Sequence, residues 1–208
     1  MENLLKTSLL PYLNKHRPGN VAPVSESTVN VSYQDKSEKL FDIVDIKDIG
    51  GTIFREYTEG QASYTNEHSK ALRFIEFERF MNDLGDVSKN RKRADYLVYT
   101  LDSKDYFVVH EISTGSIRNK RKDGRHQLEN TVELFGKIPV IKKYLGSFTE
   151  RICCLSGMDD KTKDPVSIDL MGGFNDIYDL LPDPEPINSR KCLKHGFKCY
   201  ISHNVKIV

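Results

Sequence analysis

Two acidic residues in neighbouring apolar segments are the strongest chemical signal in the sequence. Asp95 lies at the start of the segment ADYLVYTL, and Glu111 lies near the end of YFVVHEIS. Both segments are rich in β-branched and aromatic residues, and the short polar stretch DSKD joins them, a pattern typical of an antiparallel hairpin. In such a hairpin the start of one strand lies beside the end of the next. The two carboxylates should therefore be close together.

Two carboxylates at close range repel each other unless a cation binds between them. Hard oxygen ligands suit Mg²⁺ or Mn²⁺. Alternation along the second strand places Glu111 and Ser113 on the face that also carries Phe107 and Val109, so Glu111 is an acid in an apolar row. The alternative is that one acid is solvated at a strand end or pairs with a nearby arginine. We expect a divalent metal ion at Asp95 and Glu111.

A third acid lies upstream of this pair. The segment 65–84 has good helix formers and is followed by Gly85, which predicts a helix. In that helix Glu78 would share the apolar face with Phe74 and Met81 and would need a buried partner. Glu78 is therefore a candidate third metal ligand, and the alternative is that it reaches solvent at the edge of the apolar stripe.

Basic runs lie on both sides of the acidic pair. KNRKR (89–93) precedes the strand of Asp95, and RNKRKDGR (118–125) follows the strand of Glu111. Phosphates beside a metal site are held by Arg and Lys, whereas an ordinary charge run is only a solvated loop. The candidate nucleic-acid-binding residues are Arg91, Arg93, Arg118, Arg121 and Arg125.

This succession resembles the PD-(D/E)XK nuclease superfamily over about residues 65–156. The matching segments are ADYLVY, with Ala94 in place of the usual Pro, and HEIS. The family lysine falls on Ser113; in some members that lysine comes instead from the next helix or the loop before it, where this chain has Lys120, which we favour, and Lys122. Gln127 resembles the glutamine that RecB-like members carry downstream, which makes it a further candidate nucleic-acid-binding residue.

The resemblance implies an α/β fold with a mixed central β-sheet flanked by helices, a restriction-endonuclease-like core. It also implies a metal-dependent phosphodiesterase that cleaves DNA or RNA with metal-activated water, in which Asp95, Glu111 and Lys120 or Lys122 are catalytic. Two alternatives remain: a catalytically inactive nucleic-acid-binding or assembly module on the same fold, and an enzyme acting on a small cyclic nucleotide. Ser113 is the main argument for the inactive module.

The C-terminal part carries four zinc-type ligands in the pattern C-x2-H-x3-C-x3-H. They are Cys192, His195, Cys199 and His203. If the segment FKCYISHNV is one strand, Cys199 and His203 lie about 13 Å apart, too far for one ion without a bend. We therefore expect ordinary packing here, with structural zinc as the alternative. Adjacent cysteines such as Cys153 and Cys154 rarely pair, so no disulfide framework is expected.

The length of 208 residues and 38% hydrophobic content predict a single domain, 1–208. Within it the resemblance implies a nuclease-like core over about 65–156, with an N-terminal arm (1–40) and a C-terminal extension (157–208). Further expected elements are a hairpin from LFDIVDI and TIFREY, a helix over about 125–136, a strand in FTERICCLSG, a further strand in PVSIDL, and a final strand in the tail. No segment approaches the length of a membrane span, and reduced cysteines fit the cytoplasm. Net charge is only +1, so affinity for nucleic acid depends on local clusters. A homodimer is compatible with this interpretation.

Overall fold

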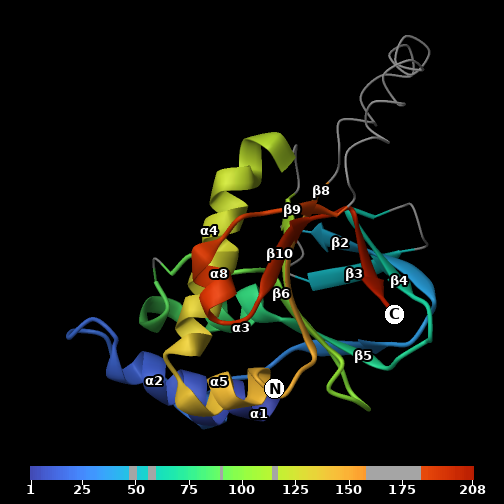
Figure 1. Ribbon diagram of the computed structural model, residues 1–208. Coiled ribbons are helices and arrows are strands. Elements are labelled where there is room, and N and C mark those ends of the chain that lie inside the picture. The colour runs from blue at the N-terminus through green and yellow to red at the C-terminus, as the bar shows by residue number, and fades with distance from the viewer. Residues whose placement is uncertain (47–50, 56–59, 90, 114–116, 158–183) are drawn as a thin grey trace.

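The computed structural model describes residues 1–46, 51–55, 60–89, 91–113, 117–157 and 184–208. In these ranges the chain forms two β-sheets, and most of the helices pack on one face of the larger sheet (Figure 1). The helices are α1 (Glu2–Leu4), the π-helix η1 (Leu5–Leu9), α2 (Leu10–Lys15), the 3-10 helix η2 (Glu26–Thr28), α3 (Phe77–Asp83), the 3-10 helix η3 (Gly85–Val87), α4 (Ile117–Gly136), α5 (Pro139–Leu145) and α8 (Arg190–Lys194). The strands are β1 (Tyr33–Lys36), β2 (Leu40–Ile46), β3 (Gly51–Arg55), β4 (Ala62–Asn66), β5 (Leu72–Glu76), β6 (Tyr96–Thr100), β7 (Tyr106–Ser113), β8 (Glu150–Gly157), β9 (Glu185–Pro186), β10 (Lys198–Ile201) and β11 (Asn204–Ile207).

The larger sheet is a seven-stranded mixed sheet in the order β1-β5-β6-β7-β8-β10-β9. The pairs β1–β5, β5–β6 and β6–β7 are antiparallel, β7, β8 and β10 are parallel to one another, and β9 is antiparallel to β10. Parallel strands need a crossover, and α4 supplies it between β7 and β8. This confirms the predicted hairpin and the expected α/β fold, a mixed sheet flanked by helices.

Each central strand of this sheet is buried on both faces. Leu97 and Val109 belong to the core on the helical side, and Val98 and Val108 belong to the core between the two sheets. Alternation of side chains along a strand explains the division. It also means that Asp95 and Glu111, two residues from Leu97 and Val109, lie on the helical side.

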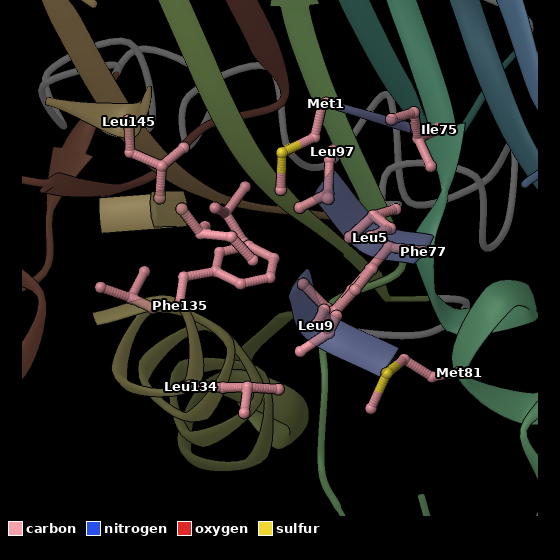
Figure 2. Close-up of a cluster of buried hydrophobic side chains, with 14 of the residues drawn as sticks. Met1, Leu5, Leu9, Ile75, Phe77, Met81, Leu97, Leu134, Phe135 and Leu145 are labelled. Atoms are coloured by element: carbon pink, nitrogen blue, oxygen red, sulfur yellow. The ribbon is translucent and has the colours of Figure 1, made fainter. Parts of the chain in front are cut away.

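The N-terminal arm, for which the sequence predicts no clear structure, is a nearly continuous helical segment from Glu2 to Lys15 that belongs to the core. Leu5 and Leu9 are fully buried, and burial of each contributes about 1.5–3 kcal/mol. Figure 2 shows both side chains directed toward Phe77 and Leu97. The arm therefore covers the helical face of β5 and β6.

The smaller sheet has the order β11-β4-β2-β3 and packs against the opposite face of the larger one. Aromatic rings fill the space between the sheets: Phe41 and Tyr64 stack with centroids 5.3 Å apart, and Phe74 meets Tyr64 edge-on at 5.1 Å. The predicted hairpin of LFDIVDI and TIFREY is confirmed as β2 and β3.

The predicted helix over 65–84 is mostly wrong. Residues Ala62–Asn66 form β4 and Leu72–Glu76 form β5, and only Phe77–Asp83 are helical. β5 lies between β1 and β6 and buries apolar side chains on both faces, Leu72 and Phe74 between the sheets and Ile75 on the helical side, so its sequence does not alternate between apolar and polar residues. Followed directly by the short helix α3, these apolar residues have the spacing of one longer helix.

Two other boundaries differ from expectation. Helix α4 begins at Ile117, so the basic segment expected as a loop is helical. The tail forms two strands, with β10 in the larger sheet and β11 in the smaller one. The predicted strand FTERICCLSG is confirmed as β8, whereas PVSIDL lies outside the described residues.

In the described part of the chain no helix combines the length and apolarity needed to cross a membrane.

Candidate metal and phosphate site

Asp95 and Glu111 lie opposite each other at one end of the β6–β7 pair. The register pairs Tyr96 with His110, and the next step of the antiparallel ladder brings Asp95 opposite Glu111. The backbone N–H of Ile112 donates to Oδ2 of Asp95 at 2.6 Å, which holds the carboxylate against β7. Each acidic residue is only 7% exposed. Two adjacent carboxylates on one face, largely withdrawn from solvent, form the centre of the candidate site.

Helix α4 lies directly over Glu111 because Gly124 permits a close approach. A Cβ atom at Gly124 would be 2.6 Å from Cδ1 of Leu155 and 3.5 Å from Cγ of Glu111, so a side chain there would force the helix outward. Glycine destabilises a helix interior by about 1 kcal/mol, but its lack of a side chain here allows α4 to contact the strands beneath it. The basic first half of α4 is thereby held over the carboxylates.

Side chains of α4 also hold the residues that lead into β6. Thr131 Oγ1 accepts from the backbone N–H of Ala94 at 2.9 Å, and Nε2 of Gln127 donates to the carbonyl of Arg93 at 3.0 Å. Gln127 was predicted as a nucleic-acid-binding residue, and its amide is used in this internal contact. Both bonds fix the position of the residue that follows them, Asp95.

The candidate third ligand, Glu78, lies in the first turn of α3 beside the acidic pair. Its backbone N–H donates to the carbonyl of Asp95 at 3.0 Å, and its charge acts on Arg93. Burial lowers the pKa of Arg93, and the negative charge of Glu78 opposes that shift. In the described part of the chain Glu78 does not join Asp95 and Glu111 in a set of three ligand atoms within 4.8 Å of one another.

Glu76 is an acid near the site that sequence reasoning did not select. It ends β5, is 7% exposed, and lies 3.1 Å from the Arg79 guanidinium. The register pairs it with Tyr96, one residue from Asp95. The helix predicted over 65–84 hid this signal, because only the strand assignment places Glu76 beside Tyr96 in the sheet.

The two candidate lysines occupy different sides of α4. Residues in a helix advance by about 100°, so Lys120 lies about 40° from the direction of Gly124, and Lys122 lies about 160° from it. Both side chains are exposed. Lys120 is therefore on the side of the helix that faces the acids, one turn before Gly124, and Lys122 is on the far side. Ser113, at the family's lysine position, is buried on the same strand face as Glu111.

Several of the candidate phosphate-binding arginines already bind acids in the folded chain. Arg121 pairs with Glu185 at 2.6 Å and Arg125 with Glu129 at 2.8 Å. Arg93 donates to Asn82 and to the carbonyl of Arg91. The side chain of Arg118 lies outside the described residues.

Arg91 is partly exposed, with a long 3.5 Å contact from its guanidinium to the carbonyl of His16. Lys120 is exposed as well. Among the described cations near the acids, Arg91, Arg93, Lys120 and Lys122 have no recorded carboxylate within 4.0 Å, and of these Arg93 already donates to Asn82 and to a backbone carbonyl. The basic surface is thus smaller than the sequence indicates.

A second group of possible metal ligands comes from β8, α8 and β10. The Sγ atoms of Cys153, Cys192 and Cys199 all lie within 4.8 Å of one another, and all three residues are buried. The zinc pattern considered from sequence shares two of these residues. His203 is exposed, with its Nδ1 atom 3.4 Å from the carbonyl of Gly157, and is not part of this group.

Sequence reasoning missed Cys153 because it is distant in sequence from the other two cysteines. Alternation on β8 does separate it from Cys154, which faces the core between the two sheets. That alternation was the available signal, but the partners of Cys153 became visible only once β10 was placed beside β8.

The chain matches no protein-family model, and neither curated proteins nor solved structures give a significant match.

Proposed function

We propose that the protein is a metal-dependent nuclease that hydrolyses phosphodiester bonds of DNA or RNA at Asp95 and Glu111. The observation that carries the proposal is the placement of these two buried carboxylates opposite each other, on the sheet face covered by the basic half of α4. The succession of β6, β7 and α4 supports the resemblance to the PD-(D/E)XK superfamily and its restriction-endonuclease-like core.

The acidic pair fits a Mg²⁺ or Mn²⁺ ion. Magnesium is usually bound by one or two carboxylates and completes its octahedron with waters and substrate phosphate oxygens, so a third protein ligand is not required. Asp95 and Glu111 supply hard oxygen atoms, and Glu78 in the neighbouring turn is the proposed further ligand. The ion would activate a water molecule and neutralise charge on the phosphate.

The chain's own residues bind and orient the substrate around that ion. Lys120, on the side of α4 toward the acids, provides a point charge for the scissile phosphate and takes the role of the missing lysine. Arg91 holds a flanking phosphate and extends the contact along the backbone. Gln127 keeps Asp95 in place through the carbonyl of Arg93.

The experiment is cleavage of labelled single- and double-stranded DNA and RNA by the full chain with Mg²⁺ or Mn²⁺. Asp95→Asn and Glu111→Gln should each reduce the rate about 100-fold or more, since removal of one electrostatic group from such a site has effects of that order. Glu150→Gln is the matched control, because Glu150 is an acid at the opposite end of the sheet, paired with Lys198. Absence of cleavage in all four substrates, or full activity of Asp95→Asn, would overturn the proposal.

A second experiment tests the lysine. Lys120→Gln should lower kcat much more than Lys122→Gln, because Lys122 lies on the far side of α4. Equal effects on kcat would exclude Lys120 as the substitute for the family lysine.

The second candidate function is a nucleic-acid-binding or assembly module without catalysis. Ser113 at the lysine position favours it, because a serine cannot supply the charge of the family lysine. Electrophoretic mobility shifts separate the two: binding that needs no metal and yields no product supports the module.

An enzyme acting on a small cyclic nucleotide is a third candidate, and it would need an enclosed pocket at the acids. A cavity of about 360 Å³ lies instead between the end of α4 and the segment Leu193–Phe197, and neither Asp95 nor Glu111 lines it. Competition of cyclic nucleotides with the labelled oligonucleotides tests this candidate.

A further inference from the structure

Three buried thiols meet at one point in the core on the helical side of the larger sheet. Cys153 comes from β8, Cys192 from α8 and Cys199 from β10. Cys153 and Cys192 are fully buried and Cys199 is 6% exposed. The Sγ atoms of Cys153 and Cys192 are 3.8 Å apart, and all three Sγ atoms lie within 4.8 Å of one another.

These separations match those of sulfur atoms around one tetrahedral ion. Zinc binds thiolate sulfur at about 2.3 Å, which places two sulfurs of a tetrahedral site about 3.8 Å apart. Sulfurs joined in a disulfide are about 2.05 Å apart, far closer than this pair. Shifts of less than about 1 Å would bring the widest pair to the separation that an ion requires.

The elements that carry the thiols are held independently of any ion. β10 pairs in register with β8, where Cys199 is opposite Cys153. Ser189 caps α8 by accepting from the backbone N–H of Cys192 at 3.2 Å, and its own hydroxyl donates to Glu129 of α4 at 2.8 Å. The arrangement of the three thiols is thus set by the fold, and an ion would meet a preformed site.

We propose that Cys153, Cys192 and Cys199 bind one zinc ion that fastens the C-terminal segment to the sheet. Soft thiolate ligands select zinc over magnesium or manganese, so this site is chemically distinct from that of Asp95 and Glu111. Binding releases the three thiol protons to solvent as the thiolates form. The segment 184–208 follows β8 only after a long stretch of chain, and the ion would link two of its elements directly to β8.

His195 is the fourth ligand in this proposal. It lies three residues after Cys192, and its Nδ1 atom is buried and has no hydrogen-bond partner in the described part of the structure. Its ring packs against Gly136 at the end of α4, where a Cβ atom would be 2.1 Å from Cε1 of the imidazole. A rotation of the side chain toward the thiols would complete a Cys₃His site, one of the common structural zinc sets.

The test uses the full chain, reduced and reconstituted with Zn²⁺ and then passed through a desalting column. Elemental analysis should find about one zinc per chain, and Co²⁺ in its place should give the thiolate charge-transfer and intense visible bands of a tetrahedral site. Cys192→Ser and Cys199→Ser should lose both signals. Cys154→Ser is the matched control, because Cys154 is a buried cysteine of the same strand that faces the other core, and it should keep both.

Thiol labelling keeps the test decisive if a variant does not fold. In urea below the unfolding transition, where buried thiols become accessible through local opening, zinc should slow the alkylation of three thiols of the wild-type chain, and a chelator should remove that protection and lower the melting temperature. The proposal is overturned if folded, reduced wild-type protein retains no zinc, or if Cys154→Ser loses zinc as Cys192→Ser does. An unchanged Co²⁺ spectrum in His195→Ala would overturn the assignment of the fourth ligand.

Discussion

Acidification should destabilise this protein through one buried histidine, His110, in the middle of β7. Its side chain is 0% exposed and lies in a chain of hydrogen bonds that joins the two sheets. Ser156 Oγ donates to the carbonyl of Ser202 at 2.6 Å, so it accepts from Nε2 of His110 at 2.8 Å. Nδ1 of the ring is then the acceptor for the Tyr64 hydroxyl at 2.7 Å. The fold therefore holds the neutral ring with its proton on Nε2.

The magnitude follows from the pKa. Burial lowers the pKa of His110 from 6.5 to about 3. Between these values the unfolded chain binds a proton that the folded chain does not, so stability falls as the pH falls below 6.5. The slope is about 1.4 kcal/mol per pH unit, which gives a loss of about 2 kcal/mol between about pH 7.5 and pH 5.0.

Urea unfolding at both pH values measures this loss, and a non-titrating variant isolates it from other groups. In His110→Gln the amide can accept from Tyr64 and donate to Ser156, so this variant should lose about 2 kcal/mol less than wild type over the same interval. His203→Gln, at an exposed histidine, should lose as much as wild type. If wild type and His110→Gln lose stability equally, His110 is not the neutral buried ring that the hydrogen bonds require.

Two further predictions concern packing and charge. Gly124→Ala should destabilise the protein by up to about 2 kcal/mol. Overlap of the new methyl group with Leu155 costs about 1–3 kcal/mol, and the better helix propensity of alanine offsets about 1 kcal/mol of that cost. Urea unfolding measures the difference, and increased stability of the variant would contradict the close approach of α4. Burial raises the pKa of Glu2, but hydrogen bonds from Tyr99 and Arg73 outweigh burial and lower the pKa to about 2. The contribution of the Glu2 carboxylate to folding stability is therefore complete above pH 4.5 and is lost as the pH falls toward 2. Glu2→Gln should cost about 1–3 kcal/mol at neutral pH and little at about pH 2, as thermal unfolding at both pH values would check.

The sequence predicted the hairpin that carries the acids because its two strands show their pattern locally. Tyr96–Thr100 and Tyr106–Ser113 are rich in β-branched and aromatic residues and lie a few residues apart, so turn and pairing are near neighbours in the chain. The adjacency of Asp95 and Glu111 follows from that local pairing and needs no long-range contact.

Other elements depend on contacts that are distant in sequence. Leu72–Glu76 is a strand because β1 and β6 cover its two edges, and its own composition suits a helix equally well. Gly124 normally indicates the end of a helix, yet here it lies within α4 because Leu155, 31 residues later, occupies the space beside it. The thiol group likewise needs β8 and β10 to be adjacent.

The proposed nuclease function depends on a divalent metal ion shared by Asp95 and Glu111. Its most direct test is a crystal structure of the full chain grown with Mn²⁺, with diffraction data collected at an X-ray energy where manganese scatters anomalously. We expect an anomalous peak between the Asp95 and Glu111 carboxylates in wild type and its loss in Asp95→Asn. Saturating Mn²⁺ with no peak at these two side chains, or a peak that persists in the variant, would contradict it.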